Sequence, residues 1–176
     1  MLVTNYTTYA VGPLGTNASS VMLDGFKNLK DFDYWISAGT ALGFYRDKDF
    51  IVGDTDIDIE MLWHKGIDNE IKSAMSNGFD LIRDIYHNGE PQQIAFIKDN
   101  VIFDIYIYQL EEDNIVNNSE GGLMKLPYKY FKDLKNIDTK YGSFPAPNPI
   151  EDYLKLRYGK DWIIPLHKKG LYGNDF

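Results

Sequence analysis

The 176-residue sequence predicts a mixed α/β (α+β) domain, a sheet of about four or five strands flanked by helices. Residues 54–63 alternate between acidic and apolar side chains, which is typical of a half-buried strand. Residues 17–30 and 68–77 instead place apolar side chains at helical spacing. Three further segments have the length and composition of strands: 80–86, 92–98 and 101–108.

The first part of the chain predicts a helix, a short strand and a second helix. Met22, Phe26 and Leu29 recur at helical spacing in the first helix. A strand over 32–37 then meets a helix over 40–45 at a glycine-containing turn. Glycine allows the backbone to approach a phosphate, and a helix N-terminus favours an anion. This turn is therefore a candidate phosphate contact, although such turns are commonly simple chain reversals.

The second part is predicted from its turns. Only Asp99 and Asn100 separate two of the strands, which indicates an antiparallel hairpin. We expect a short helix within 126–134 and a proline-containing loop over 144–149. A last helix over 150–158 has proline just before it and glycine just after it. We expect all of these elements to belong to one domain covering residues 1–176.

Composition excludes several classes of protein. The net charge is −8, which argues against binding a long nucleic acid through its phosphates. The chain has no cysteine, so disulfides, thiolate zinc sites and thiol nucleophiles are excluded, and we expect a cytoplasmic protein. The sequence contains no signal-peptide pattern and no apolar run of the roughly 18 residues needed to span a bilayer. It does not indicate the oligomeric state.

The alternating segment carries the strongest functional signal. Alternate side chains of a strand share a face, so one face is acidic throughout: Asp54, Asp56, Asp58 and Glu60. We expect the other face to enter the core: Ile57, Ile59, Met61 and Trp63. Each pair of neighbouring carboxylates repels by on the order of 2 kcal/mol at an effective dielectric constant of about 20. A divalent cation converts that repulsion into attraction.

Two other interpretations of this strand are possible. A solvated polar face is one, but such a face normally mixes charges or includes Lys, Thr or Ser. An EF-hand calcium loop starting at Asp54 is the other, and it requires glycine at its sixth position and glutamate at its twelfth. Those positions hold Ile59 and Lys65, so the EF-hand is excluded.

A third carboxylate, Asp104, lies in the apolar segment 101–108. A buried aspartate is costly unless it is paired or bound to a metal, and a hydrogen bond to a tyrosine hydroxyl or a backbone turn is the alternative. Two carboxylates from one strand and one from its neighbour can clamp two magnesium ions for phosphoryl chemistry. We therefore predict Asp56, Asp58 and Asp104 as catalytic metal ligands for Mg²⁺, with Mn²⁺ as the alternative.

Five residues are predicted to contact the substrate. Gly39 and Thr40 lie in the turn described above, and Asp54 extends the acidic face. Arg46 can hold a phosphate through two parallel hydrogen bonds, and Lys48 follows in the same loop. The alternative for both cations is a solvated loop position. Neither a GxxxxGK loop nor a GxGxxG fingerprint is present, so P-loop and Rossmann folds lack support.

The order of these motifs resembles a known family. The turn is Gly39-Thr40-Ala41-Leu42-Gly43, followed by Arg46, by Phe50-Ile51 and by Asp54-Thr55-Asp56-Ile57-Asp58. Further on come Asp104, Phe144-Pro145, Tyr153-Leu154, Tyr158-Gly159, Trp162 and Pro165. Over residues 34–165 this pattern resembles the LicD and fukutin-related family of the nucleotidyltransferase-fold superfamily. Thr55 departs from the family pattern, which often has an acidic residue at this position. Because the chain is short, the resemblance does not identify the acceptor.

The resemblance implies a nucleotidyltransferase fold and a specific reaction. It implies transfer of a phosphoalcohol, such as phosphocholine or ribitol phosphate, from a CDP-linked donor to a glycan or other hydroxyl acceptor. In that scheme the three aspartates bind magnesium, Gly39 and Thr40 contact phosphate, and Arg46 offsets developing charge. Asp104 is one candidate to accept the proton of the acceptor hydroxyl. The residues alone indicate only metal-dependent phosphoryl or nucleotidyl transfer.

Three other functions stay open. A nucleotidyltransferase would move a nucleoside monophosphate from an NTP to a small molecule, a protein or an RNA end. A GT-A glycosyltransferase also uses a D-x-D motif, but it usually has a longer nucleotide-binding half than residues 1–53 before that motif. A catalytically inactive nucleotide-binding module is the non-enzymatic alternative, although it has little need to hold like charges together.

Overall fold

The computed structural model describes residues 1–7, 9, 11–119 and 121–165. The strands are β1 (Leu2–Tyr6), β2 (Tyr34–Ile36), β3 (Asp56–Leu62), β4 (Asp80–His87), β5 (Glu90–Lys98), β6 (Val101–Glu111), β7 (Asn114–Ser119), β8 (Gly122–Pro127), β9 (Lys135–Thr139) and β10 (Gly142–Ala146). The α-helices are α1 (Ala18–Asn28), α2 (Ala38–Arg46), α3 (Ile67–Met75) and α4 (Ile150–Tyr158). A short 3₁₀ helix covers Tyr128–Tyr130.

Eight of the strands form one mixed sheet. Its central order is β1-β4-β5-β6-β3-β2, and β7 and β8 extend it from β6. Strands β3 and β6 pair in parallel, whereas β3 pairs with β2 and β6 with β5 in antiparallel fashion. Strands β9 and β10 form a separate two-stranded sheet. The two strands that carry the predicted metal ligands are therefore direct neighbours.

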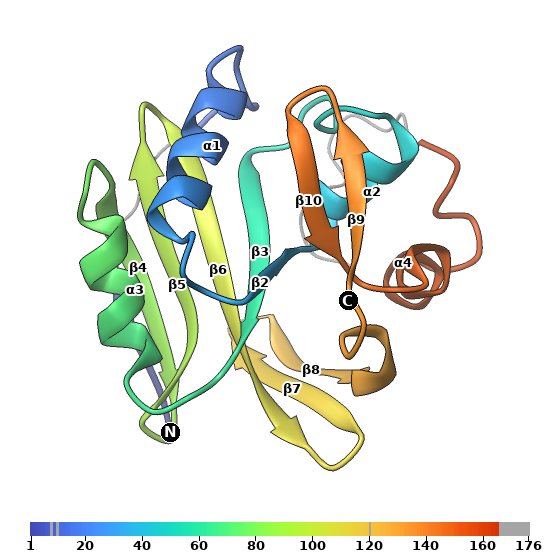
Figure 1. Ribbon diagram of the computed structural model, residues 1–176. Coiled ribbons are helices and arrows are strands. Elements are labelled where there is room, and N and C mark those ends of the chain that lie inside the picture. Colours follow the sequence, from blue (N-terminus) through green and yellow to red (C-terminus); the bar gives the residue numbers. More distant parts are fainter. Residues whose placement is uncertain (8, 10, 120, 166–176) are drawn as a thin grey trace.

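Helices α1 and α3 cover one face of this sheet (Figure 1). The ring of Phe26 on α1 meets the ring of Phe103 on β6 edge-on, with centroids 5.8 Å apart. Gly25 makes this approach possible, since a Cβ there would lie 2.4 Å from the Phe103 ring. Side chains alternate along a strand, so the neighbours of Phe103 and Ile57 in sequence point to the opposite face. That opposite face carries the aspartates.

Helices α2 and α4 and the β9–β10 hairpin lie together beyond the β2–β3 edge (Figure 1). Phe44 of α2 packs against Phe144 of β10 with ring centroids 5.8 Å apart. The hydroxyl of Tyr45 on α2 donates a 2.7 Å hydrogen bond to Glu151 on α4. The first contact joins α2 to the β9–β10 hairpin, and the second joins α2 to the C-terminal helix α4.

Most of the predicted elements are confirmed. The four predicted helices outside 126–134 correspond to α1 to α4, and the predicted strands correspond to β2 to β6. Asp99 and Asn100 have φ values of 49° and 62° and join β5 and β6 as the expected antiparallel hairpin. A turn with two positive φ values matches the twist of the flanking strands.

Several expectations were wrong. The sheet has eight strands and not four or five, because β1, β7 and β8 also join it. The expected helix over 126–134 is only the 3₁₀ turn, and the expected loop over 144–149 begins as β10. Proline is tolerated there because β10 pairs with a single neighbour, β9. Trp63 is 38% exposed just beyond β3, so it does not enter the core as expected.

Among the described residues, no helix is long and apolar enough to cross a membrane. The cytoplasmic location inferred from the sequence stays a prediction. The same holds for the single domain over 1–176, since residues 166–176 lie outside the described part of the chain.

Candidate metal centre

Three carboxylates meet on the sheet face opposite α1. Asp56 and Asp58 come from β3, and Asp104 comes from β6. The parallel register makes Asp58 and Asp104 Cα partners, which places their side chains on the same face. One oxygen from each of the three carboxylates lies within 4.8 Å of the others. Asp58 and Asp104 are only 7% and 2% exposed, so the cluster is largely shielded from water.

Burial perturbs the ionisation of this cluster. It raises the pKa of Asp104 to about 6 and that of the adjacent Asp54 to about 7. Burial, reinforced by the charges of Asp56 and Asp54, also holds the pKa of Asp58 well above its ordinary value. Simultaneous ionisation of these carboxylates is therefore unfavourable in the absence of a cation. The charge of a bound divalent cation would favour their ionised forms. A site made only of carboxylate oxygens fits the ligand preference of Mg²⁺ or Mn²⁺.

Two residues that the sequence did not reveal hold Asp104. Gln93 on β5 donates a 2.9 Å hydrogen bond from Nε2 to Asp104 Oδ1. Arg83 on β4 places its guanidinium 3.7 Å from Asp104 Oδ2. Across the strands Arg83, Ala95 and Asp104 are successive Cα partners, so they line up in one row on the acidic face. The one signal in the sequence was the pair of glutamines, Gln92 and Gln93, directly before the apolar run Ile94–Ile97 of β5.

The N-terminus of α2 holds Asp58. The backbone N–H of Gly39 donates to Asp58 Oδ2 at 3.1 Å, and the backbone N–H of Asp58 donates to Thr40 Oγ1 at 2.9 Å. A Cβ on Gly39 would lie 2.6 Å from Asp54 Oδ2, so glycine allows this carboxylate to approach the helix. Gly39, Thr40 and Asp54 therefore adjoin the aspartates. In this structure the first two contact Asp58, and the expected phosphate contact stays a prediction.

Arg46 and Lys48 do not adjoin the aspartates. They lie at and beyond the C-terminal end of α2, about 10 Å along the helix axis from Gly39. Arg46 donates two 2.7 Å hydrogen bonds to Asp47, and Lys48 lies over the Tyr45 ring at 5.2 Å. Neither residue lines the cavity beside the aspartates, and the expectation that both contact the phosphate stays a prediction.

A cavity of about 230 Å³ opens beside the carboxylates. Its lining residues come from α2, β3, β8, α4 and the loop before β3: Ala38, Gly39, Leu42, Ile51, Asp54, Asp56, Asp58, Met124, Arg157 and Tyr158. A wider groove of about 1250 Å³ at the other end of β3 is not lined by Asp56, Asp58 or Asp104. The smaller cavity is therefore the candidate substrate site.

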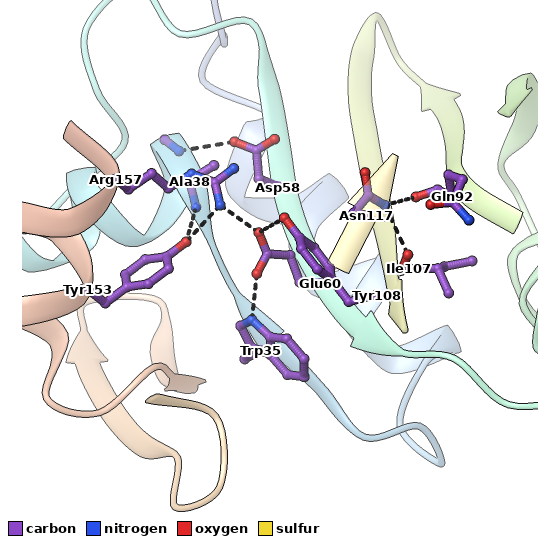
Figure 2. A network of polar contacts seen from close by, with 11 residues as sticks. Trp35, Ala38, Asp58, Glu60, Gln92, Ile107, Tyr108, Asn117, Tyr153 and Arg157 are labelled. Carbon is purple, nitrogen blue, oxygen red and sulfur yellow. Dashed lines mark hydrogen bonds and ion pairs between the residues drawn. The ribbon is translucent and has the colours of Figure 1, made fainter. Parts of the chain in front are cut away.

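Arg157 is a further residue that the sequence reasoning did not select. Its Nη1 donates a 2.8 Å hydrogen bond to Oε1 of Glu60, which is fully buried on β3 (Figure 2). Trp35 Nε1 donates to the other oxygen of Glu60 at 2.8 Å. Glu60 thus shares the acidic face of β3 but is paired with Arg157. Since 97 residues separate the pair, no local pattern reveals it.

Comparison with known proteins places this site in a family. Residues 31–149 match the family described as LicD/FKTN/FKRP, nucleotidyltransferase domain. The mouse protein named ribitol-5-phosphate transferase FKTN is 27% identical over 146 residues, which cover 80% of this chain and 32% of the mouse protein. The human protein of the same name is 26% identical over 137 residues, covering 76% of this chain and 30% of the human protein. The chain thus spans about a third of the length of these relatives.

Among solved structures, a Thermotoga maritima protein described as a nucleotidyltransferase aligns with a TM-score of 0.49 and 19% identity. That alignment covers 78% of this chain and 83% of the other. The family match covers most of this chain and includes the α2 turn, β3 and β6. It confirms both the resemblance noted in the sequence and the nucleotidyltransferase fold. The chain belongs to the LicD/FKTN/FKRP nucleotidyltransferase-domain family.

Proposed function

We propose that this domain transfers a phosphoalcohol, such as ribitol phosphate or phosphocholine, from a CDP-linked donor to a hydroxyl group of a glycan. Asp56, Asp58 and Asp104 would hold Mg²⁺ or, in its place, Mn²⁺. The observation that carries this proposal is the meeting of three carboxylates, two buried and one half-buried, within 4.8 Å beside a cavity. The relatives named ribitol-5-phosphate transferase support the choice of a phosphoalcohol.

The proposed reaction is a displacement at phosphorus. The acceptor hydroxyl oxygen attacks the phosphorus that carries the alcohol and forms a new P–O bond. The bond from that phosphorus to the oxygen of the nucleotide phosphate breaks, and CMP leaves with the electron pair. The hydroxyl proton passes to a carboxylate of the site. When bound, the metal ion supplies positive charge for the phosphate oxygens.

The protein's own contribution is to hold the ligands in place before the substrate arrives. Gly39 and Thr40 fix Asp58 through hydrogen bonds of 3.1 and 2.9 Å. Gln93 fixes Asp104 from the neighbouring strand. Side chains that orient metal ligands in this way typically change metal affinity or activity by about 10- to 100-fold when they are removed. The surrounding apolar walls, Leu42, Ile51 and Met124, limit the access of water to the cavity.

The test is a transfer assay with separate donors. CDP-ribitol, CDP-choline, CTP and ATP are each incubated with a hydroxyl-bearing glycan, with and without Mg²⁺, and products are identified by mass spectrometry. We expect CMP and a phosphoalcohol-modified glycan from one of the CDP donors, only with the metal. The variant Asp56→Ala/Asp58→Ala should lose this product, whereas Asp31→Asn should not. Asp31 is an exposed carboxylate whose ion-pair partner within the described part of the chain is the neighbouring Lys30.

The other outcomes distinguish the remaining functions. Pyrophosphate release from CTP or ATP with a nucleotidylated product would replace the proposal with nucleotidyl transfer. Transfer of a sugar without its phosphate would indicate a glycosyltransferase. Metal-dependent binding of a nucleotide without any turnover, across a broad set of acceptors, would favour the inactive binding module.

A further inference from the structure

We propose that Arg157 binds the diphosphate of the donor from the α4 side of the cavity, facing the carboxylates that hold the metal. This inference extends the proposed function, since it rests on a donor that contains a diphosphate. It assigns to Arg157 the phosphate contact that the sequence suggested for Arg46. The site would thus receive the donor between a metal-binding wall on β3 and a cationic wall on α4.

The first observation is the position of Arg157. Its side chain is 13% exposed and lines the cavity of about 230 Å³ together with Asp56 and Asp58. Figure 2 shows it extending from α4 toward β3, where Asp58 and Glu60 lie. Among the described residues that line this cavity, Arg157 is the cation. A phosphate that reached the metal ligands would therefore meet this guanidinium as well.

The second observation is the way in which the guanidinium is held. Nη1 donates to Glu60 Oε1 at 2.8 Å and to the hydroxyl of Tyr153 at 3.2 Å. Glu60 is itself fixed by Trp35 at 2.8 Å and by the hydroxyl of Tyr108 at 3.3 Å. The bonds to Glu60 and Tyr153 start from one nitrogen, and Tyr108 is a further hydrogen-bond partner of the guanidinium. A guanidinium carries five N–H donors on three nitrogens, so the group is oriented in advance and has more donors than these three partners.

The third argument is that a purely structural role does not explain the ion pair between Arg157 and Glu60. Replacing a buried ion pair by apolar residues of similar volume is often neutral or stabilising, so stability alone does not account for this one. The guanidinium geometry matches phosphate oxygens through two parallel hydrogen bonds. A fixed cation also stabilises the charge that develops on a leaving phosphate as its P–O bond breaks. Both properties suit a diphosphate held beside a metal.

The experiment measures binding of inorganic pyrophosphate by calorimetry in the presence of Mg²⁺. It compares the wild type with Arg157→Gln, Arg157→Lys and the matched control Lys155→Gln, which removes an exposed charge from the same helix. We expect Arg157→Gln to weaken pyrophosphate binding by about 10- to 100-fold and the control to leave it unchanged. Arg157→Lys should give an intermediate loss, since it keeps the charge but not the paired donors.

A second measurement separates ligand binding from a structural role. Mn²⁺ affinity, followed by electron paramagnetic resonance without pyrophosphate, should stay within about threefold of wild type in both Arg157 variants. Wild-type pyrophosphate affinity in Arg157→Gln would overturn the inference. It would also be overturned if Arg157→Lys lost Mn²⁺ affinity to the same extent as it lost pyrophosphate affinity. If Arg157→Gln does not fold, Arg157→Lys decides alone: undiminished pyrophosphate affinity in it overturns the inference.

The two proposals fail in distinguishable ways. Pyrophosphate binding that depends on Arg157 supports this inference even if no CDP-linked donor is turned over. Absence of turnover would contradict only the proposed function. Conversely, phosphoalcohol transfer that is unaffected by Arg157→Gln keeps the proposed function and removes this inference. A wild-type protein that does not bind pyrophosphate with Mg²⁺ also overturns it.

Discussion

Asp58 on β3 and Asp104 on β6 are Cα partners in a parallel pair of neighbouring strands. Neighbouring strands lie about 4.8 Å apart, so two carboxylates in this register point side by side from the same face. Both are nearly fully buried, which makes their mutual repulsion costly in the absence of a cation. A divalent metal ion bound between these carboxylates would therefore reduce their repulsion and stabilise the folded protein.

Replacing Asp58 by asparagine should stabilise the metal-free protein and abolish its response to metal. The amide keeps an acceptor for the Gly39 N–H but removes one of the like charges. We expect the free energy of unfolding at pH 8 without divalent metal to rise by about 1–2 kcal/mol. Thermal unfolding with and without Mg²⁺ measures both effects. An equal gain in stability from Mg²⁺ in the variant and in Asp31→Asn would contradict the assignment.

Stability without metal should fall as the pH rises from about 4 to about 7. The folded-state pKa values of Asp54 and Asp104 are raised to about 7 and about 6, above an unfolded value of about 3.9. Between those values the folded protein binds more protons than the unfolded chain, so deprotonation favours unfolding. The contribution is complete below the unfolded pKa and lost above the folded one.

Urea unfolding between pH 4 and 8 in EDTA measures this slope. The variant Asp54→Asn/Asp104→Asn should flatten it relative to wild type. Asp49, whose pKa is lowered mainly by its hydrogen bond with Lys140, contributes the opposite slope in both proteins and cancels in the difference. Identical slopes in the two proteins would show that these carboxylates do not carry the effect.

Replacing Gly39 by alanine should impair the site while leaving the fold intact. The added Cβ would lie 2.6 Å from Asp54 Oδ2 and 3.4 Å from Asp58 Oδ2, so both carboxylates must move. Alanine is otherwise favourable in a helix, by about 1 kcal/mol relative to glycine. We expect an unchanged or higher melting temperature together with at least a tenfold loss of Mn²⁺ affinity.

Gly121→Ala provides the matched control, since a Cβ there would meet no atom within 4 Å. Calorimetric titration with Mn²⁺ and a thermal melt of each variant are sufficient. Loss of stability in Gly39→Ala without a change in metal affinity would mean that the glycine serves only the packing of α2.

Replacing Gln93 by leucine should weaken metal binding through Asp104. The substitution removes the 2.9 Å hydrogen bond that orients the carboxylate and leaves Asp104 Oδ1 without that donor. We expect a loss of Mn²⁺ affinity of about 10- to 100-fold. The control is Gln109→Leu, since Gln109 on β6 bonds to Glu90 and not to an aspartate of the site. Equal Mn²⁺ affinities in the two variants would remove Gln93 from the site.

The sequence predicted the features that depend on local pattern. Alternation along 54–63 indicated β3 and its acidic face, and two residues with turn-forming character indicated the β5–β6 hairpin. It also selected Asp56, Asp58 and Asp104 as a group, and the structure brings these three together. It missed β1, β7 and β8, because short polar strands carry little apolar alternation and depend on the sheet edge that they join.

By itself, therefore, the sequence determined the mixed α/β class, the family motifs and the three carboxylates, since side-chain periodicity and motif order are properties of the chain alone. Tertiary structure alone decided which cations lie near them, Arg83 beside Asp104 and Arg157 across the cavity. Arg46 points toward Asp47 at the far end of α2, whereas Arg157 reaches Glu60 across 97 residues of sequence. The position of Arg157 depends on how α4 packs against α2 and β3. Burial of apolar surface drives this packing, and the spacing of residues along the chain does not reveal which elements will pack together.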